Sequence, residues 1–273
     1  MYANPKSSAR GAITVPRLHE MKAKGEKIVV LTAYDASFAA QCEAAGVDIV
    51  LVGDSLGMVV QGRSSTLPVS VDEMVYHTAA VARGLSSALL VADMPFMSFR
   101  DADTALRTAE RLMASAGAAM VKLEGADYVL DVVHELSRRA VPVCAHLGLT
   151  PQSVHKLGGY RMQGKTKAAA EQLVADAKAL AQAGADLLVL EAVPAGLAKR
   201  VTTEISVPTI GIGAGPDCDG QVLVLYDMLG ITPGKRPRFS KDFLAGRGSV
   251  LDGIRAYADA VRTGKFPADE HTF

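Results

Sequence analysis

Two aspartates end short apolar runs and are suited to hold one metal ion. Asp54 closes IVLVGD (49–54), and Asp93 lies in LLVADMPF (89–96). No Cys or His pair stands at a metal-binding spacing, so the donors are oxygens, which suit Mg²⁺ with one or two carboxylates and open positions. A 2-oxo acid can chelate such an ion, which then stabilises the enolate formed when a base removes the neighbouring proton. A lone Asp after a strand more often caps the next helix, as we expect for Asp35.

Lys122 and Glu124 stand two positions apart in the apolar run MVKLEG (120–125). Residues i and i+2 of a strand project from the same face, so this lysine and this glutamate point the same way. If that face is the interior of a barrel, both are costly to bury without a partner or a ligand. The pair therefore favours a functional interpretation over a structural one.

His146 and Glu191 also follow apolar runs, in AHLGLT and at the end of LLVLE. Each alone is compatible with a structural role. Tyr34 stands at the end of the first expected strand, and Ser55 follows Asp54 at the end of the second, so the first six expected strands all deliver polar or ionisable groups. In a barrel these ends share one rim, where active sites lie, and the convergence favours function for the whole group.

Two glycine-containing stretches allow two interpretations each. GIGAGP (211–216) is either a loop that approaches a cofactor or simply a tight turn, because a short glycine pattern outside a Rossmann unit is weak evidence. HKLGGYRMQGKTK (155–167) is either a mobile lid over the site or a solvated loop.

Short apolar runs that alternate with Ala-rich helical segments position these residues. We expect eight strands within 28–35, 49–54, 89–96, 120–125, 141–148, 187–193, 208–215 and 222–229. Three of the connections place Gly46, Gly117 and Gly184 where a helix ends in the left-handed conformation. Eight strands, and no GxGxxG after the first, favour a closed α/β (β/α)8 TIM barrel over an open doubly wound sheet.

The ends of the chain add helices to this barrel. Thr14 is expected to cap a helix that stops at Gly25 and covers the lower end of the barrel, and residues 240–264 are expected to form terminal helices. No composition shift marks a second domain, so we expect one domain over 1–273, close to the usual barrel length of about 250 residues.

Composition narrows the class of ligand. Twenty-nine Lys and Arg residues balance twenty-nine Asp and Glu residues, so no net positive charge would attract nucleic acid. We therefore expect a small-molecule ligand. No apolar run is long enough to span a membrane. Three scattered cysteines and a polar N-terminus without an apolar signal region indicate reduced thiols and a cytoplasmic location.

The chain resembles the ketopantoate hydroxymethyltransferase family over nearly its whole length. The resemblance rests on LTAYDASFA, VDIVLVGDSLGMVVQG, STLPVSVDEMVYHT, VADMPFMSF, VKLEG, PVCAHLGLTPQSVHKLGGYRMQGKT, LLVLEAVP, PTIGIGAGPDCDGQVLVLYDMLG and KRPRF. Motifs of this length in this order are highly specific.

The resemblance implies a reaction and a role for each site residue. The one-carbon unit of 5,10-methylenetetrahydrofolate would be transferred to 3-methyl-2-oxobutanoate, giving 2-dehydropantoate and tetrahydrofolate. By resemblance Asp54 and Asp93 are Mg²⁺ ligands, Glu124 reaches the metal through water, and Glu191 is the base. Substrate contacts would come from Asp54, Ser55, Asp93, Lys122 and His146. A homodecamer is implied in the same way. The folate, unlike the metal pair and the enolisation, follows from the resemblance alone.

Two rival functions remain. One is an Mg²⁺-dependent 2-oxo acid C–C lyase or mutase of the isocitrate lyase and phosphoenolpyruvate mutase type. Lyases of that kind carry a KKCGH-type loop with a catalytic Cys, whereas Cys144 here stands inside an expected strand. The other is a barrel without activity kept as a binding protein, which should have lost some of the rim carboxylates.

Overall fold

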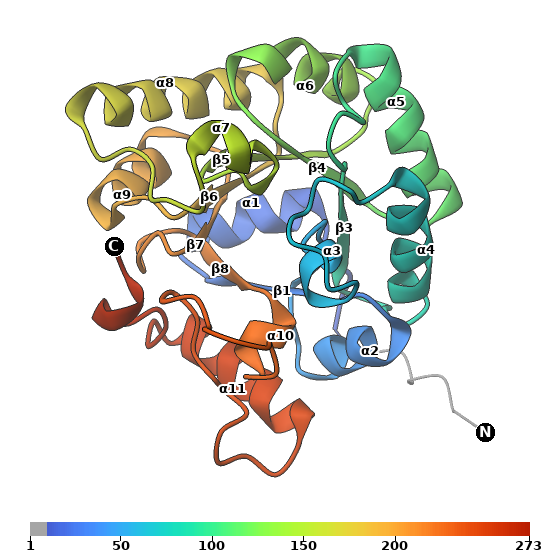
Figure 1. Cartoon of the computed structure of the whole chain (residues 1–273), viewed down its shortest axis with the longest axis vertical. Coiled ribbons are helices and arrows are strands. Elements are labelled where there is room, and N and C mark those ends of the chain that lie inside the picture. Colours follow the sequence, from blue (N-terminus) through green and yellow to red (C-terminus); the bar gives the residue numbers. More distant parts are fainter. Residues whose placement is uncertain (1–9) are drawn as a thin grey trace.

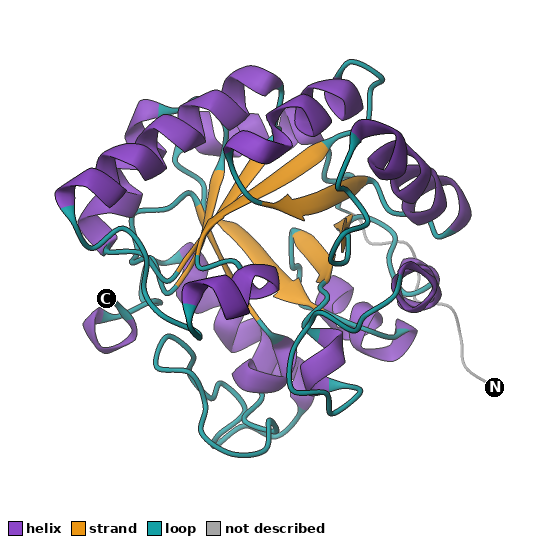
Figure 2. Cartoon of the chain, turned by 45° about the horizontal axis from the view of Figure 1, so that its top comes forward, coloured by secondary structure: helices purple, strands orange, loops and turns teal. Residues whose placement is uncertain are grey.

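A closed parallel barrel forms the centre of the computed structural model, which describes residues 10–273 (Figures 1 and 2). Residues 1–9 lie outside the described residues. They include the start of the polar N-terminal stretch and the first positions of the domain expected over 1–273. Each strand pairs with the next, and the last pairs with the first. The strands are β1 (Ile28–Thr32), β2 (Ile49–Val52), β3 (Leu89–Asp93), β4 (Met120–Glu124), β5 (Val143–Gly148), β6 (Leu187–Glu191), β7 (Thr209–Ile212) and β8 (Gly220–Leu223). The expected (β/α)8 TIM barrel is confirmed.

Helices surround the barrel, so the strands are buried on both faces and their sequences are almost continuously apolar (Figure 2). The helices are α2 (Ala36–Ala44), α3 (Leu56–Val59), α4 (Val71–Ala82), α5 (Ala102–Glu110), α6 (Leu130–Ser137), α7 (Val154–Leu157), α8 (Lys167–Ala183), α9 (Ala195–Glu204), α10 (Leu225–Met228) and α11 (Val250–Arg262). Asp35 caps α2 by accepting a hydrogen bond from the backbone of Phe38, as expected. Gly46, Gly117 and Gly184 all have positive φ, which confirms the predicted helix ends.

Alternate strand residues separate two packing layers. Val29 and Leu31 face the helices, whereas Ile28 and Val30 belong to a cluster inside the barrel. The interior cluster also includes Met120, so Lys122 and Glu124, two and four positions later, share the interior face. The barrel interior is therefore apolar at its lower end and polar at the carboxyl ends of its strands.

Helix α1 (Val15–Lys24) covers the lower end, as expected. Thr14 caps it by accepting a hydrogen bond from the backbone of Arg17, and Gly25 ends it with φ 68°. Its buried residues Leu18 and Met21 belong to the same cluster as the barrel interior. Figure 1 shows α1 behind the strands, away from the site described below.

Two of the expected elements were wrong in part. The eighth strand is Gly220–Leu223, and half of the run 222–229 instead forms the short helix α10. Gly220 is required there because an added Cβ would lie 2.3 Å from the carbonyl oxygen of Ile28 in the paired strand. At the C-terminus, α11 starts only at Val250, since Ser249 caps it and residues 240–249 form turns.

Within residues 10–273, none of the helices has the combined length and apolar character needed to cross a membrane.

Candidate active site

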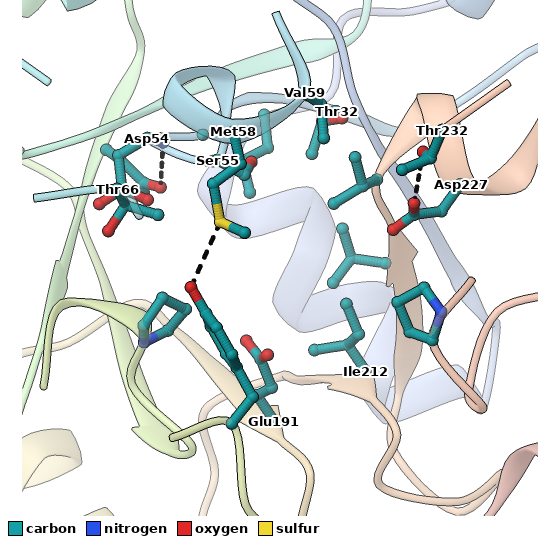
Figure 3. A pocket seen from close by; sticks show the side chains of 18 of the residues that line it. Thr32, Asp54, Ser55, Met58, Val59, Thr66, Glu191, Ile212, Asp227 and Thr232 are labelled. Carbon is teal, nitrogen blue, oxygen red and sulfur yellow. Dashed lines mark hydrogen bonds between the residues drawn. The ribbon is translucent and has the colours of Figure 1, made fainter. Parts of the chain in front are cut away.

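A cavity of about 640 Å³ opens at the carboxyl ends of the barrel strands (Figure 3). It brings together all of the site residues expected from the sequence, which come from β2 to β6 and the turns that follow them. They are Asp54, Ser55, Asp93, Lys122, Glu124, His146 and Glu191. The volume lies in the range typical of small-molecule sites.

Asp93 is the centre of a buried polar network. Its Oδ1 lies 2.7 Å from Lys122 Nζ, and its Oδ2 accepts a hydrogen bond of 3.0 Å from the backbone N–H of Asp54. A Cβ at position 53 would lie 2.8 Å from Ser55 Oγ. Gly53 therefore leaves room for the Ser55 hydroxyl beside this network.

His146 lies between two glutamates. Its Nδ1 is 3.4 Å from Glu124 Oε1, and its Nε2 is 3.3 Å from Glu191 Oε2. Neither ring nitrogen makes a hydrogen bond to a described residue, although the side chain is buried. Burial and the nearby Lys122 ammonium lower the pKa of His146, which favours the neutral imidazole. A neutral ring has one nitrogen that donates a hydrogen bond and one that accepts, so in this position it can bond to a ligand or to either glutamate.

The buried charges of the network do not balance. Three carboxyl groups, of Asp54, Asp93 and Glu124, surround the single ammonium of Lys122, and all four residues are at most 5% exposed. Burial raises the pKa of Asp54 well above its usual range and that of Glu124 to about 7, and their carboxylate neighbours add to both shifts. Burial alone would lower the pKa of Lys122, but Asp93, Glu124 and Asp54 together raise it. A bound cation would stabilise the ionised forms of these carboxyl groups and so oppose both shifts.

No group of three or more His, Cys, Asp or Glu side chains within residues 10–273 is arranged as a complete metal cluster. The two neighbouring carboxylates, Asp54 and Asp93, match the one or two protein carboxylates with which Mg²⁺ is usually bound.

Gln152 is a site residue that the sequence analysis missed. It lies in the 3-10 turn Pro151–Ser153 after β5, and its side-chain amide donates to Asp54 Oδ2 at 2.9 Å and to the Met94 carbonyl at 3.0 Å. Its backbone N–H donates to Glu124 Oε2 at 3.0 Å. Gln152 therefore links two of the acidic groups. The sequence feature that could have indicated Gln152 is the preceding Pro151, which begins a turn shortly after β5.

Smaller groups complete the site. Tyr34 Oη and Ser55 Oγ are 2.9 Å apart, so Tyr34 orients the Ser55 hydroxyl at the rim. Within the expected lid 155–167, Tyr160 lines the cavity, and its hydroxyl lies 3.3 Å from the sulfur of Met58. The glycine run 211–216 contributes to the cavity wall through Ile212. Both stretches thus adjoin the site, and their roles stay predictions.

The sequence profile of the family described as ketopantoate hydroxymethyltransferase matches residues 12–269. The chain belongs to this family. It is 58% identical over 273 residues to the 3-methyl-2-oxobutanoate hydroxymethyltransferase of Alkalilimnicola ehrlichii, covering 100% of this chain and 99% of that one. The enzyme of the same name from Paraburkholderia phymatum is 58% identical over 266 residues, covering 97% and 98%. The chain is therefore an enzyme that transfers one-carbon groups, a hydroxymethyltransferase, as the sequence predicted.

Solved structures with similar folds are more distant. A phosphonopyruvate hydrolase has a TM-score of 0.62 at 15% identity, covering 92% of this chain and 96% of that one. The same kind of enzyme, in complex with oxalate and Mg²⁺, has a TM-score of 0.60 at 15% identity, covering 90% and 95%. At this identity the likeness shows the barrel fold alone, and the reaction has to be argued from the site.

Proposed function

We propose that this enzyme transfers the one-carbon unit of 5,10-methylenetetrahydrofolate, with water, to 3-methyl-2-oxobutanoate. The products are 2-dehydropantoate and tetrahydrofolate, in the synthesis of pantothenate. The observation that supports this most is the meeting of Asp54, Asp93, Lys122 and Glu191 in one cavity of a chain that belongs to the family. The relatives named above carry the corresponding substrate in their names.

Asp54 and Asp93 are the proposed ligands of a divalent metal, taken to be Mg²⁺, and Glu124 would reach it through water. The fit is supported by the all-oxygen donor set and by the excess of buried carboxylates over Lys122. When bound, the metal supplies a Lewis acid for the keto and carboxylate oxygens of the substrate.

The remaining residues bind the 2-oxo acid and move its proton. The Lys122 ammonium and the Ser55 hydroxyl would hold the substrate carboxylate, and His146 would donate to or accept from its oxygens. Glu191, which borders the cavity and is less buried than the other carboxylates, is the proposed base that takes the proton from C3. Water would break the two C–N bonds of the folate methylene group, releasing tetrahydrofolate and leaving the carbon as formaldehyde. The carbanion would then add to that carbonyl carbon, and its oxygen would take up a proton to give the hydroxymethyl group.

Uptake of deuterium at C3 tests this proposal most directly. The purified enzyme in D₂O with Mg²⁺ should exchange the C3 proton of 3-methyl-2-oxobutanoate, and adding the folate should give 2-dehydropantoate. Nuclear magnetic resonance follows both processes. Cleavage of a 2-methylisocitrate-like acid without folate, together with no exchange, would favour the lyase instead.

We also propose one domain over 1–273, a cytoplasmic location and a homodecamer, the last on family resemblance alone. Analytical ultracentrifugation of the purified chain measures the assembly, and a monomer would refute the decamer.

A further inference from the structure

The cavity extends well beyond the acidic groups that would hold the 2-oxo acid. Its volume of about 640 Å³ suits a drug-sized ligand, whereas 3-methyl-2-oxobutanoate is a small acid. Figure 3 shows Asp54 at one side of this space and Asp227 with Thr232 at the other, with Ile212 below them. The far side is therefore available for a second, larger molecule.

Asp227 lies in α10, directly after β8, and is the acidic residue of this far wall. Its carboxylate is 6% exposed, and Oδ1 accepts a hydrogen bond of 2.6 Å from Thr232 Oγ1. Within residues 10–273 it forms no ion pair and accepts no other side-chain hydrogen bond. Burial raises its pKa more than the Thr232 hydrogen bond and the charge of Arg236 lower it, so ionisation of this carboxylate is costly here. A ligand that presents N–H donors would offset that cost.

Apolar side chains form part of the cavity wall. They include Ile212, Val222 and Val224, and Phe239 adds an aromatic ring. Such a surface favours a flat ring system whose polar atoms are concentrated on one edge. The pyrimidinone part of a pterin has this form, with a 2-amino group and an N3–H that point the same way, as the two donors of a guanidinium do.

We propose that Asp227, held by Thr232, binds the 2-amino and N3–H groups of the folate pterin ring. This inference rests on the proposed function. It assigns the pterin ring to the end of the cavity that the 2-oxo acid does not fill. With the pterin edge on Asp227, the ring lies over the apolar surface and its reactive methylene is directed toward the acidic groups. Asp227 is thus a residue that determines which one-carbon donor the enzyme accepts.

Binding of tetrahydrofolate to the holoenzyme with Mg²⁺, measured by isothermal titration calorimetry, tests the assignment. Asp227→Asn should weaken binding about 10- to 100-fold, because charge-assisted hydrogen bonds to a buried carboxylate are lost. Asp217→Asn, the same change at an exposed position outside the cavity, should leave the affinity unchanged. Affinity of Asp227→Asn within twofold of the parent enzyme would overturn the proposal.

A change in the ligand provides a second test, whose deciding measurement uses the parent enzyme alone. A tetrahydrofolate analogue without the 2-amino group should bind the parent enzyme at least about tenfold more weakly than tetrahydrofolate, and Asp227→Asn should discriminate little between the two. Equal affinity of the parent enzyme for both ligands would exclude recognition of the pterin edge.

Exchange of the C3 proton separates the two proposals, since it requires no folate. If the parent enzyme neither exchanges deuterium nor binds tetrahydrofolate, the proposed function itself is wrong. If it does both, and Asp227→Asn binds tetrahydrofolate normally, only the pterin assignment fails.

Discussion

Replacing Gln152 with Leu removes the side-chain amide that holds Asp54 while keeping a side chain of similar size. The structure shows two buried hydrogen bonds from this amide, 2.9 Å to Asp54 Oδ2 and 3.0 Å to the Met94 carbonyl. A bond to a charged acceptor contributes about 1.5–3 kcal/mol and a neutral one about 0.5–1.5 kcal/mol. We therefore expect the free energy of unfolding to fall by about 2–4.5 kcal/mol.

The same substitution should weaken metal binding. Residues that orient metal ligands typically contribute about 10- to 100-fold to metal affinity or activity, so the Mg²⁺ concentration for half-maximal activity should rise by that factor. Urea unfolding and a Mg²⁺ titration of turnover measure the two effects. The matched control is Gln172→Leu on α8, an exposed glutamine that bonds Asp176, where both quantities should hardly change. If Gln152→Leu matched that control in both assays, the positioning role of Gln152 would be refuted.

Four further results are expected. Asp93→Ala should nearly abolish turnover, and unchanged Mg²⁺ dependence in the residual activity would contradict its role as a ligand. Glu191→Gln should slow exchange of the C3 proton into D₂O while largely preserving substrate binding; normal exchange would assign the base elsewhere. EDTA should stop the reaction and added Mg²⁺ should restore it. Glu43→Gln should destabilise the fold at pH 7: burial alone would raise the pKa of Glu43, but hydrogen bonds from Ser87 and Ala88 lower it to about 2. The pKa of Glu43 is lower in the folded protein than in the unfolded chain. The difference in free energy of unfolding between the parent protein and Glu43→Gln, measured with urea, should therefore shrink as the pH falls from about 4.5 toward 2. A difference that stays constant over this range would contradict the prediction.

Local sequence patterns were sufficient for the barrel and most of the site. Lys122 and Glu124 were predicted to share a face because strand residues alternate, and both do line the barrel interior. The polar strand ends were predicted to meet because all parallel strands of a barrel finish on one rim. Both arguments depend on short-range periodicity and on a count of strands, which a single sequence provides.

Features that depend on long-range contacts were not predictable in this way. Gln152 contacts Asp54 across 98 positions of the chain, and no local pattern encodes that distance. The run 222–229 is apolar apart from Tyr226 and Asp227, and periodicity cannot distinguish a short buried strand from a buried helical turn in such a run. The close contact of Gly220 with Ile28, which locates β8, becomes visible only once the barrel has closed.

The cysteines argue against the lyase alternative on physical grounds. Cys144 stands inside β5, paired in register with Lys122 and Leu187, rather than on a loop above the site. Burial raises the pKa of its thiol to about 12, so it stays protonated at neutral pH and is a poor acid, base or nucleophile. Cys42 and Cys218 are also buried, with pKa values raised to about 12 and about 11. None of the three thiols is therefore placed on a loop above the site, which agrees with our proposal that a carboxylate at the rim removes the proton.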